Sequence, residues 1–201
     1  MKTNKLISWF NKQRLINNLN IKKKNKNKLN KWIFNDKIIF HKSKSFFSIK
    51  PFLLKQKNKK WFQPLIIQKE EGILGIIKRK KFNIDYYLLQ AKIEPGNING
   101  IQISPTVQAT KSNYLRKHGG KRTVFLNFFL KKKRNIKILS NLKLSEQGTR
   151  FLEKHNRNIL IEIKNINIPK KSNFCWLTKT NLKHLLQKKK YTKYGYYISI
   201  I

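Results

Sequence analysis

The pattern of hydrophobic and polar positions is most regular between Ile101 and Thr110, where the two kinds of residue alternate without a break. The apolar positions are Ile101, Ile103, Pro105, Val107 and Ala109, and the polar ones are Gln102, Ser104, Thr106, Gln108 and Thr110. Alternation with a period of two predicts a strand with one apolar and one polar face. An exposed face in a lysine-rich chain would carry lysines, so this uncharged face favours a pocket wall; a solvent-facing strand is the alternative.

A second strand is predicted just before it, from Asn83 to Ile93, and the segment between the two holds the turn dipeptides Pro-Gly and Asn-Gly. A hairpin-like reversal there pairs the strand that ends at Glu94 with the strand that starts at Ile101. The register is open, and it decides which polar residues share a face. The residues concerned are Gln90, Lys92 and Glu94 on the first strand and Gln102, Ser104 and Thr106 on the second.

Shorter elements are predicted elsewhere from apolar spacing, caps and turn residues. The helices expected are an amphipathic one within 2–19, one that starts after Ser145 and one that starts after Thr178. The strands expected are 32–34, 37–40, 46–49, a short one from Gly72, a buried one at 123–130, one at 158–163 and a final one in the tail after 190. Basic runs at 21–31 and 55–60 are predicted to be linkers.

Charge is the most conspicuous feature of the composition. The 201 residues include 47 Lys and Arg against 8 Asp and Glu, a formal net charge of +39. Taken alone, this balance indicates a ribosomal, nucleic-acid or anionic-surface partner. Lys, Asn, Ile and Phe also have AT-rich codons, so a biased AT-rich genome predicts the same composition in an ordinary enzyme. Both interpretations stay open at this point.

The lone cysteine, Cys175, cannot form a disulfide within the chain, and no Cys/His cluster suggests zinc. Apolar runs such as Leu6 to Phe10 are far shorter than the about 18 residues of a membrane span, and no signal-peptide core follows Met1. The sequence therefore predicts a soluble cytoplasmic protein of one ordinary domain, or one domain with a tail.

Candidate chemistry follows the alternating stretch. His118 suits acid or base chemistry near neutral pH, Tyr114 can donate a proton, and Glu94 stands at the end of a predicted strand. Surface or packing roles are the alternatives for all three. The phosphate loop GxxxxGK[ST], the GxGxxG fingerprint, HExxH and the glutamate-rich Nudix box are missing, which argues against metal-dependent pyrophosphate hydrolysis.

The block from Gln90 to Tyr114, QAKIEPGNINGIQISPTVQATKSNY, with HGG shortly after, resembles the signature of the NDP-hexose 2,3-dehydratase family. Three more blocks are similar in the same order: WFQPLIIQKEEGILGII before it, and SEQGTRFLEKHNRN and FCWLTKTNLKHLL after it. A weaker fourth lies within 32–49, so the resemblance covers about 32–186.

The resemblance implies an α/β fold of Nudix-like architecture, with a mixed sheet flanked by helices in a single domain at 32–201, after an amino-terminal helix and basic linker at 1–31. It implies a substrate such as dTDP-4-keto-6-deoxyglucose, from which water is lost across C2 and C3 in deoxysugar biosynthesis. Such an elimination needs a base near C3, donors for an enolate oxygen at C4 and an acid for the C2 hydroxyl. No cofactor and no metal are expected, and no membrane or nucleic acid as partner.

Site roles follow from the resemblance as hypotheses. The proton-handling candidates are Tyr114 and His118, with Glu94 as an alternative base. The expected contacts to sugar or enolate oxygens are Gln90, Lys92, Gln102, Ser104 and Gln108. The expected contacts to the nucleotide diphosphate are Lys111, Asn113, Arg116 and Arg157.

The chain also departs from the family pattern. Members usually carry two copies of this unit and this chain holds one, so a homodimer is expected to rebuild the pair. Leu126-Asn127-Phe128-Phe129 stands where LEYF is expected, and the closing segment is a Lys- and Tyr-rich tail. A non-catalytic homologue that binds or assembles is therefore an alternative, and a basic nucleic-acid-binding protein is a more remote one.

Overall fold

The computed structural model describes residues 3–17, 19–97, 100–115, 122–131 and 133–187. The helices are α1 (Thr3–Ile16), the 3-10 turn η1 (Lys26–Lys28), α2 (Lys111–Tyr114), α3 (Asn127–Leu130) and α4 (Lys179–Gln187). The strands of the smaller sheet are β1 (Trp32–Phe34), β2 (Ile39–His41), β3 (Ser48–Gln56) and β4 (Lys59–Ile67). Those of the larger sheet are β5 (Gly72–Lys81), β6 (Ile84–Ile93), β7 (Ile101–Ser104), β8 (Val107–Thr110), β9 (Ile136–Ser145), β10 (His155–Ile163) and β11 (Phe174–Thr178).

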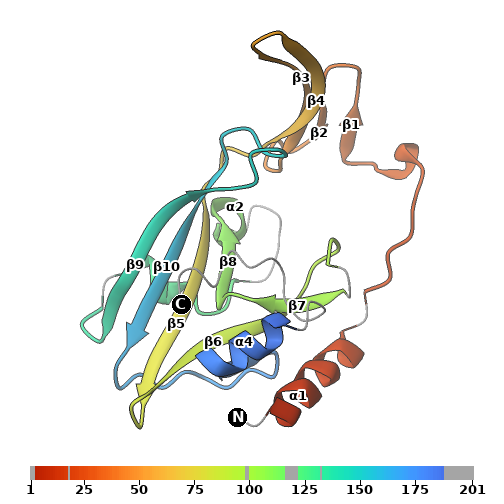
Figure 1. Cartoon of the computed structure of the whole chain (residues 1–201). Helices are drawn as coiled ribbons and strands as arrows, with labels where there is room; N and C mark the ends of the chain where they lie inside the picture. The colour runs from red at the N-terminus through yellow and green to blue at the C-terminus, as the bar shows by residue number, and fades with distance from the viewer. Residues whose placement is uncertain (1–2, 18, 98–99, 116–121, 132, 188–201) are drawn as a thin grey trace.

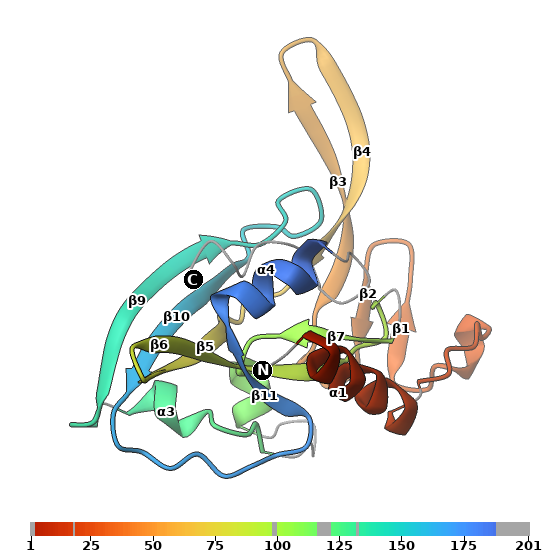
Figure 2. The ribbon, with the colours of Figure 1, turned by 60° about the horizontal axis from the view of Figure 1, so that its bottom comes forward.

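The smaller sheet is antiparallel, with its four strands in the order β1-β2-β3-β4. Its β3–β4 hairpin projects well beyond the rest of the molecule (Figures 1 and 2). The linker predicted at 55–60 is wrong, because Lys55 pairs with Lys60 and the chain turns at Lys57, whose φ is 50°. A hairpin tip of exposed lysines lacks the apolar alternation by which a strand is recognised.

The larger, seven-stranded sheet is mixed. Its main path runs β11-β6-β5-β10-β9, with β7 on β6 and β8 on β5. Strands β5 and β10 are parallel, and every other pairing in this sheet is antiparallel. The predicted α/β class with a mixed sheet flanked by helices is confirmed.

Thr106 lies at a fork in this sheet. Strands β5 and β6 pair up to Ile77 and Leu88 and then separate, and the gap is filled by β7 beside β6 and β8 beside β5. The buried hydroxyl of Thr106 accepts a hydrogen bond from Ile77 N at 3.0 Å and donates one to Leu88 O. It thus bridges the two backbones where their direct pairing ends.

The predicted hairpin reversal is confirmed, with Lys92 opposite Gln102 and Gln90 opposite Ser104. The single strand predicted from Ile101 to Thr110 is wrong, because the chain breaks at Pro105 and Thr106 and changes partner. The break also moves the apolar positions from one face of the sheet to the other. Ile101 and Ile103 belong to one hydrophobic core, and Val107 and Ala109 belong to another.

Each face of the larger sheet carries a core. On one face α1 and α4 contribute Leu6, Phe10, Leu182 and Leu185, all between 0% and 3% exposed. On the other face the segment before and within α3 contributes Phe125 and Leu126. Figure 2 shows α4 and α3 on opposite sides of the strands. The predicted amino-terminal helix is confirmed, and its apolar side belongs to the first core.

The strand predicted at 123–130 is wrong: residues 124–126 form a turn and α3 follows. A short apolar run does not distinguish a buried strand from a buried helical turn. The helical turn brings Phe129 against Gly75 of β5, where an added Cβ would come within 2.5 Å of the Phe129 ring. Gly75 therefore leaves room for α3 to lie close to the sheet.

The helix predicted after Ser145 is also wrong. Strand β9 runs to Ser145, which pairs with His155 of β10, and residues 146–154 form the connecting loop. The loop backbone bonds to β4 instead, with Ile66 N donating to Arg150 O at 2.7 Å and Leu152 N donating to Ile66 O at 3.0 Å. These long-range bonds outweigh the local helix-cap signal of Ser145.

The last predicted helix is confirmed as α4, and the Thr178 hydroxyl accepts a hydrogen bond from Asn181 N at 3.2 Å. The strand predicted at 158–163 is confirmed within β10. The predicted tail strand lies outside the described residues. Among the described helices, none has the length and apolar character that crossing a membrane requires.

Candidate functional site

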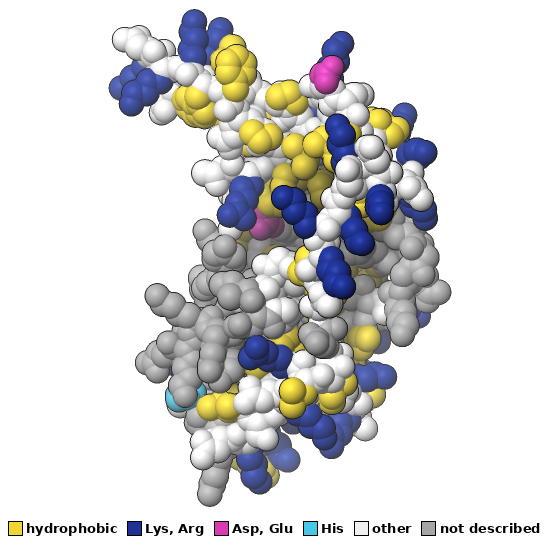
Figure 3. All heavy atoms as spheres, turned by 90° about the vertical axis from the view of Figure 1, so that its right-hand side faces the viewer, with side chains coloured by type: hydrophobic (Ala, Val, Ile, Leu, Met, Phe, Trp, Pro, Cys, Tyr) yellow, Lys and Arg dark blue, Asp and Glu magenta, His cyan; other side chains and the backbone are white. Residues whose placement is uncertain are grey.

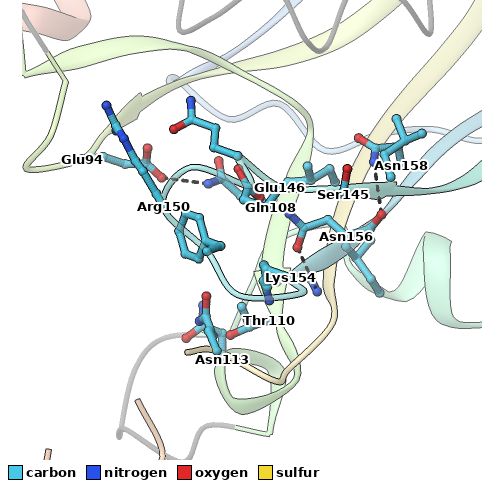
Figure 4. A pocket seen from close by; sticks show the side chains of 18 of the residues that line it. Glu94, Gln108, Thr110, Asn113, Ser145, Glu146, Arg150, Lys154, Asn156 and Asn158 are labelled. Atoms are coloured by element: carbon cyan, nitrogen blue, oxygen red, sulfur yellow. Dashed lines mark hydrogen bonds between the residues drawn. The ribbon is translucent and has the colours of Figure 1, made fainter. Parts of the chain in front are cut away.

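A pocket of about 670 Å³ opens where β8, β5, β10 and β9 lie side by side, under the loop that joins β9 to β10 (Figure 4). This volume is within the range of small-molecule sites. Its charged and polar lining residues include Lys92, Glu94, Gln108, Thr110, Asn113, Glu146, Arg150, Lys154, Asn156 and Asn158.

Two rows of residues across the strands form the floor. One row runs Gln108, Leu74, Asn158 and the next runs Thr110, Gly72, Asn156. Gly72 N donates to Asn156 Oδ1 at 3.2 Å, and a Cβ at Gly72 would lie 2.5 Å from that oxygen. Gly72 is therefore needed for the close approach that fixes Asn156.

Asn156 in turn orients an acidic side chain. Its Nδ2 donates to the Glu146 carboxylate, and its backbone oxygen accepts a hydrogen bond from Asn158 Nδ2 at 3.2 Å. Asn156 and Asn158 are 8% and 5% exposed, so these bonds lie away from bulk water. Glu146 consequently stands in the pocket with one carboxylate oxygen held in place.

The opposite side of the pocket holds a second acidic group, Glu94. Its carboxylate lies 3.1 Å from Lys92 Nζ and accepts a hydrogen bond from Gln108 Nε2 at 3.0 Å (Figure 4). These contacts link the β6–β7 hairpin to β8. Glu94 is therefore already engaged with a cation and an amide.

Lys154 is a buried cation in the pocket wall. The residue is 5% exposed, and its Nζ donates to the backbone oxygen of Glu70. Burial lowers the pKa of Lys154 below its ordinary value of 10.5, and the charges of Glu146, Glu70 and Glu71 offset part of that effect. Lysine at such a site is a better proton donor than an exposed lysine.

The acidic residues Glu70 and Glu71, which lie next to each other in the sequence, make different side-chain contacts. Glu70 accepts hydrogen bonds from Ser112 N at 3.1 Å and from Ser112 Oγ at 2.6 Å, at the start of α2. Glu71 lies 3.9 Å from Lys143 Nζ on an exposed part of the sheet. Neither lines the pocket.

The predicted site residues separate into three groups. Those that line the pocket are Lys92, Glu94, Gln108 and Asn113. Those that the structure places outside its lining are Gln90, Gln102, Ser104, Lys111, Tyr114 and Arg157. The other two, Arg116 and His118, lie outside the described residues.

The contacts and burial of the six other described residues explain why they do not line the pocket. Gln102 and Ser104 are 4% and 2% exposed within the β6–β7 hairpin, opposite Lys92 and Gln90. Gln90 donates to Pro105 O at 3.0 Å, and Tyr114 packs against the second core. Arg157 alternates with Asn156 and Asn158 along β10 and therefore points to the other face. Lys111 is exposed where α2 begins.

The pocket also contains residues to which the sequence assigned no role: Glu146, Arg150, Lys154, Asn156 and Asn158. The helix predicted after Ser145 concealed this grouping, because a helix would point these side chains in different directions. The strand–loop–strand connection that forms instead places them around one pocket. The available signal was that Asn156 and Asn158, spaced by two, lead directly into the apolar strand residues Ile159 to Ile161.

No group of three or more His, Cys, Asp or Glu residues with metal-binding geometry occurs among the residues that the structure describes. The polar groups of the pocket are amides, hydroxyls, carboxylates and amines. Such groups suit a ligand with many hydroxyl and carbonyl oxygens.

Fold and pocket together define an α/β protein with a polar pocket of small-molecule size on a mixed sheet. The model of the NDP-hexose 2,3-dehydratase family matches residues 3–195, and the chain belongs to this family.

Three relatives bear the name dTDP-4-dehydro-6-deoxy-alpha-D-glucopyranose 2,3-dehydratase. The protein of Amycolatopsis orientalis is 34% identical over 92% of this chain and 41% of its own length. The protein of Streptomyces violaceoruber is 40% identical over 73% of this chain and 34% of its own length. The protein of Saccharopolyspora spinosa is 44% identical over 59% of this chain and 24% of its own length. The chain thus spans between about a quarter and two fifths of these relatives.

Solved structures give weaker matches. An ADP compounds hydrolase has a TM-score of 0.43 and 11% identity, over 73% of this chain and 78% of its own. The Ap4A hydrolase of C. elegans has a TM-score of 0.34 and 13% identity, over 61% of this chain and 96% of its own. The Nudix-like architecture stays a prediction at these scores.

Proposed function

We propose that this chain eliminates water across C2 and C3 of a nucleotide-linked 4-keto-6-deoxyhexose, as its relatives' names indicate for them. The pocket is the proposed site. We propose a cytoplasmic location, with which the free thiol of Cys175 is compatible.

One observation carries this proposal. The pocket holds carboxylates and a buried ammonium around fixed amides, which are the kinds of group that the reaction requires. The C4 ketone makes the C3 proton acidic, so a carboxylate can remove it. Donors then stabilise the enolate oxygen at C4, and an acid assists departure of the C2 hydroxyl.

The nucleotide is proposed to lie toward the pocket rim at Asn113 and Arg150. Both residues line the pocket, and both are exposed to solvent. A guanidinium can bind a diphosphate through two parallel hydrogen bonds. Arg150 thereby takes the part that the sequence gave to Arg157.

The test is incubation with dTDP-4-keto-6-deoxyglucose, followed by mass spectrometry for loss of one water. We expect a dehydrated product and, by calorimetry, binding that changes little with salt. Ligand binding without turnover would select the non-catalytic homologue. The nucleic-acid-binding hypothesis would be selected if the chain bound RNA with an affinity that falls steeply as salt rises and did not bind the sugar nucleotide.

On the face shown in Figure 3, Lys and Arg side chains are scattered over the hairpin and the body and interspersed with apolar groups. A nucleic-acid interface gathers its basic residues into a patch or stripe. On this face, the dispersion favours compositional background as the interpretation of the basic residues.

We also propose a homodimer through β9. Among the described residues this edge strand pairs only with β10, and it exposes Ile138, Leu139, Leu142 and Leu144, each between 38% and 51% exposed. An open apolar edge is a template for pairing with another chain, and a two-fold axis lets β9 pair with its own copy.

Leu142→Lys is expected to shift the mass measured by light scattering from dimer to monomer, because a charge would be buried at that edge. Leu53→Lys is the matched control. Leu53 is 46% exposed on the β3–β4 hairpin, away from β9. A wild-type chain that is monomeric throughout the concentration range would contradict the dimer.

A further inference from the structure

The ammonium of Lys154 is buried in the pocket wall, and the described part of the chain gives it no ion-pair partner. Among the described residues, no carboxylate lies within salt-bridge distance of its Nζ, and the backbone oxygen of Glu70 is its hydrogen-bond acceptor. Burying an unpaired charge is costly. Ionisable residues whose burial destabilises the fold are found mainly at functional sites, because the chemistry there requires them.

Glu146 is the carboxylate that shares this part of the pocket. Its backbone N donates to Lys154 O at 2.8 Å, so the two residues are adjacent across the loop. Asn156 holds one oxygen of the Glu146 carboxylate, and among the described residues no cation lies within salt-bridge distance of it. Figure 4 shows Glu146, Asn156 and Lys154 on the same side of the pocket.

Glu94 is less suited to removing a proton. The contact with Lys92 at 3.1 Å and the hydrogen bond from Gln108 at 3.0 Å both stabilise its ionised form and occupy its lone pairs. A carboxylate engaged in this way is a weaker base. Glu94 suits fixing the hairpin and orienting Lys92 toward a ligand.

We propose that Glu146 and Lys154 are the catalytic base and acid of the elimination, an assignment that rests on the proposed function. The Glu146 carboxylate takes the C3 proton, and the electron pair of that bond forms the C3–C4 enolate. As the C4 carbonyl reforms, the C2–C3 double bond forms and the C2–O bond breaks. The departing hydroxyl takes a proton from Lys154 Nζ and leaves as water.

The step balances without a co-reactant. The sugar loses one hydrogen from C3 and one hydroxyl from C2. The product keeps the C4 carbonyl and has a C2–C3 double bond that bears the C3 hydroxyl, which is an enol of the 3,4-diketone. Glu146 ends protonated and Lys154 ends neutral, and one proton passing from the first to the second through solvent restores both. Asn156 acts as a positioning residue for Glu146.

Removal of each group should separate the two halves of the reaction. In D₂O, Lys154→Met is expected to slow water loss about 10²–10⁴-fold while deuterium still enters at C3, because the base remains. Glu146→Gln is expected to abolish both deuterium entry and water loss. Mass spectrometry of the recovered sugar nucleotide measures both quantities.

Matched controls remove the same charges outside the pocket. Lys143→Met, on the exposed side of β9, and Glu153→Gln, exposed in the same loop, should leave both rates unchanged. Urea unfolding and binding of the sugar nucleotide check that each variant is intact. Lys154→Gln replaces the methionine variant if the latter does not fold.

The outcomes are distinguishable. Water loss at the wild-type rate in the Lys154 variant overturns the acid, and so does loss of C3 exchange together with water loss. Retained C3 exchange in Glu146→Gln overturns the base. Absence of water loss in the wild-type protein overturns the proposed function, and this assignment with it.

Discussion

Replacing Thr106 by valine is expected to lower the free energy of unfolding by about 2–6 kcal/mol, since two buried backbone groups would each lose a partner worth about 1–3 kcal/mol. The groups are Ile77 N and Leu88 O, which the Thr106 hydroxyl bridges at the fork of the sheet. Valine has nearly the same shape, so the loss isolates the hydroxyl. Urea denaturation followed by tryptophan fluorescence gives the change.

Thr106→Ser is the matched control because it keeps the hydroxyl and removes only a methyl group, worth about 1 kcal/mol when buried. The valine variant should also bind the sugar nucleotide more weakly, since β8 carries Gln108 into the pocket from the same fork. Equal stabilities of the valine and serine variants would show that the bridge contributes little.

The hairpin from Ile84 to Ser104 was predictable because its signals are local: strand alternation on each side and turn dipeptides between. The change of partner at Thr106 was not. It depends on β5 and β6 separating within a sheet whose other strands, β10 beside β5 and β11 beside β6, come from far along the chain. The unbroken alternation from Ile101 to Thr110 therefore belongs to two strands, and the apolar residues of each strand pack in a different core.

The candidate site was predicted on one side only. Lys92, Glu94 and Gln108 lie in or beside that local hairpin, and the pocket contains them. Lys154 and Asn156 come from the β9–β10 connection, where a helix cap signal at Ser145 competes with pairing to β4. Helical and extended forms place these side chains on different faces, so local propensity could not identify them.

The position of the amino-terminal helix makes the domain boundary testable. The sequence placed residues 1–31 outside the unit that starts at residue 32. In the structure Phe10 is 1% exposed and Leu6 is 0% exposed, both in one core with α4. The indole of Trp9 also donates to Ser172 O at 2.8 Å, which ties α1 to the segment before β11.

Phe10→Ala is consequently expected to lower the free energy of unfolding by about 3–5 kcal/mol, the loss typical of a buried phenylalanine. Leu15→Ala on the same helix is the control: Leu15 is 83% exposed, and the change should stay within about 0.5 kcal/mol. Urea denaturation of both variants gives the comparison. If both unfold like the wild-type protein, α1 contributes nothing to the folded unit and the boundary at residue 32 stands. A loss confined to Phe10→Ala places α1 inside the domain, because a separate helix would not transmit the cavity at Phe10 to the unfolding of the sheet.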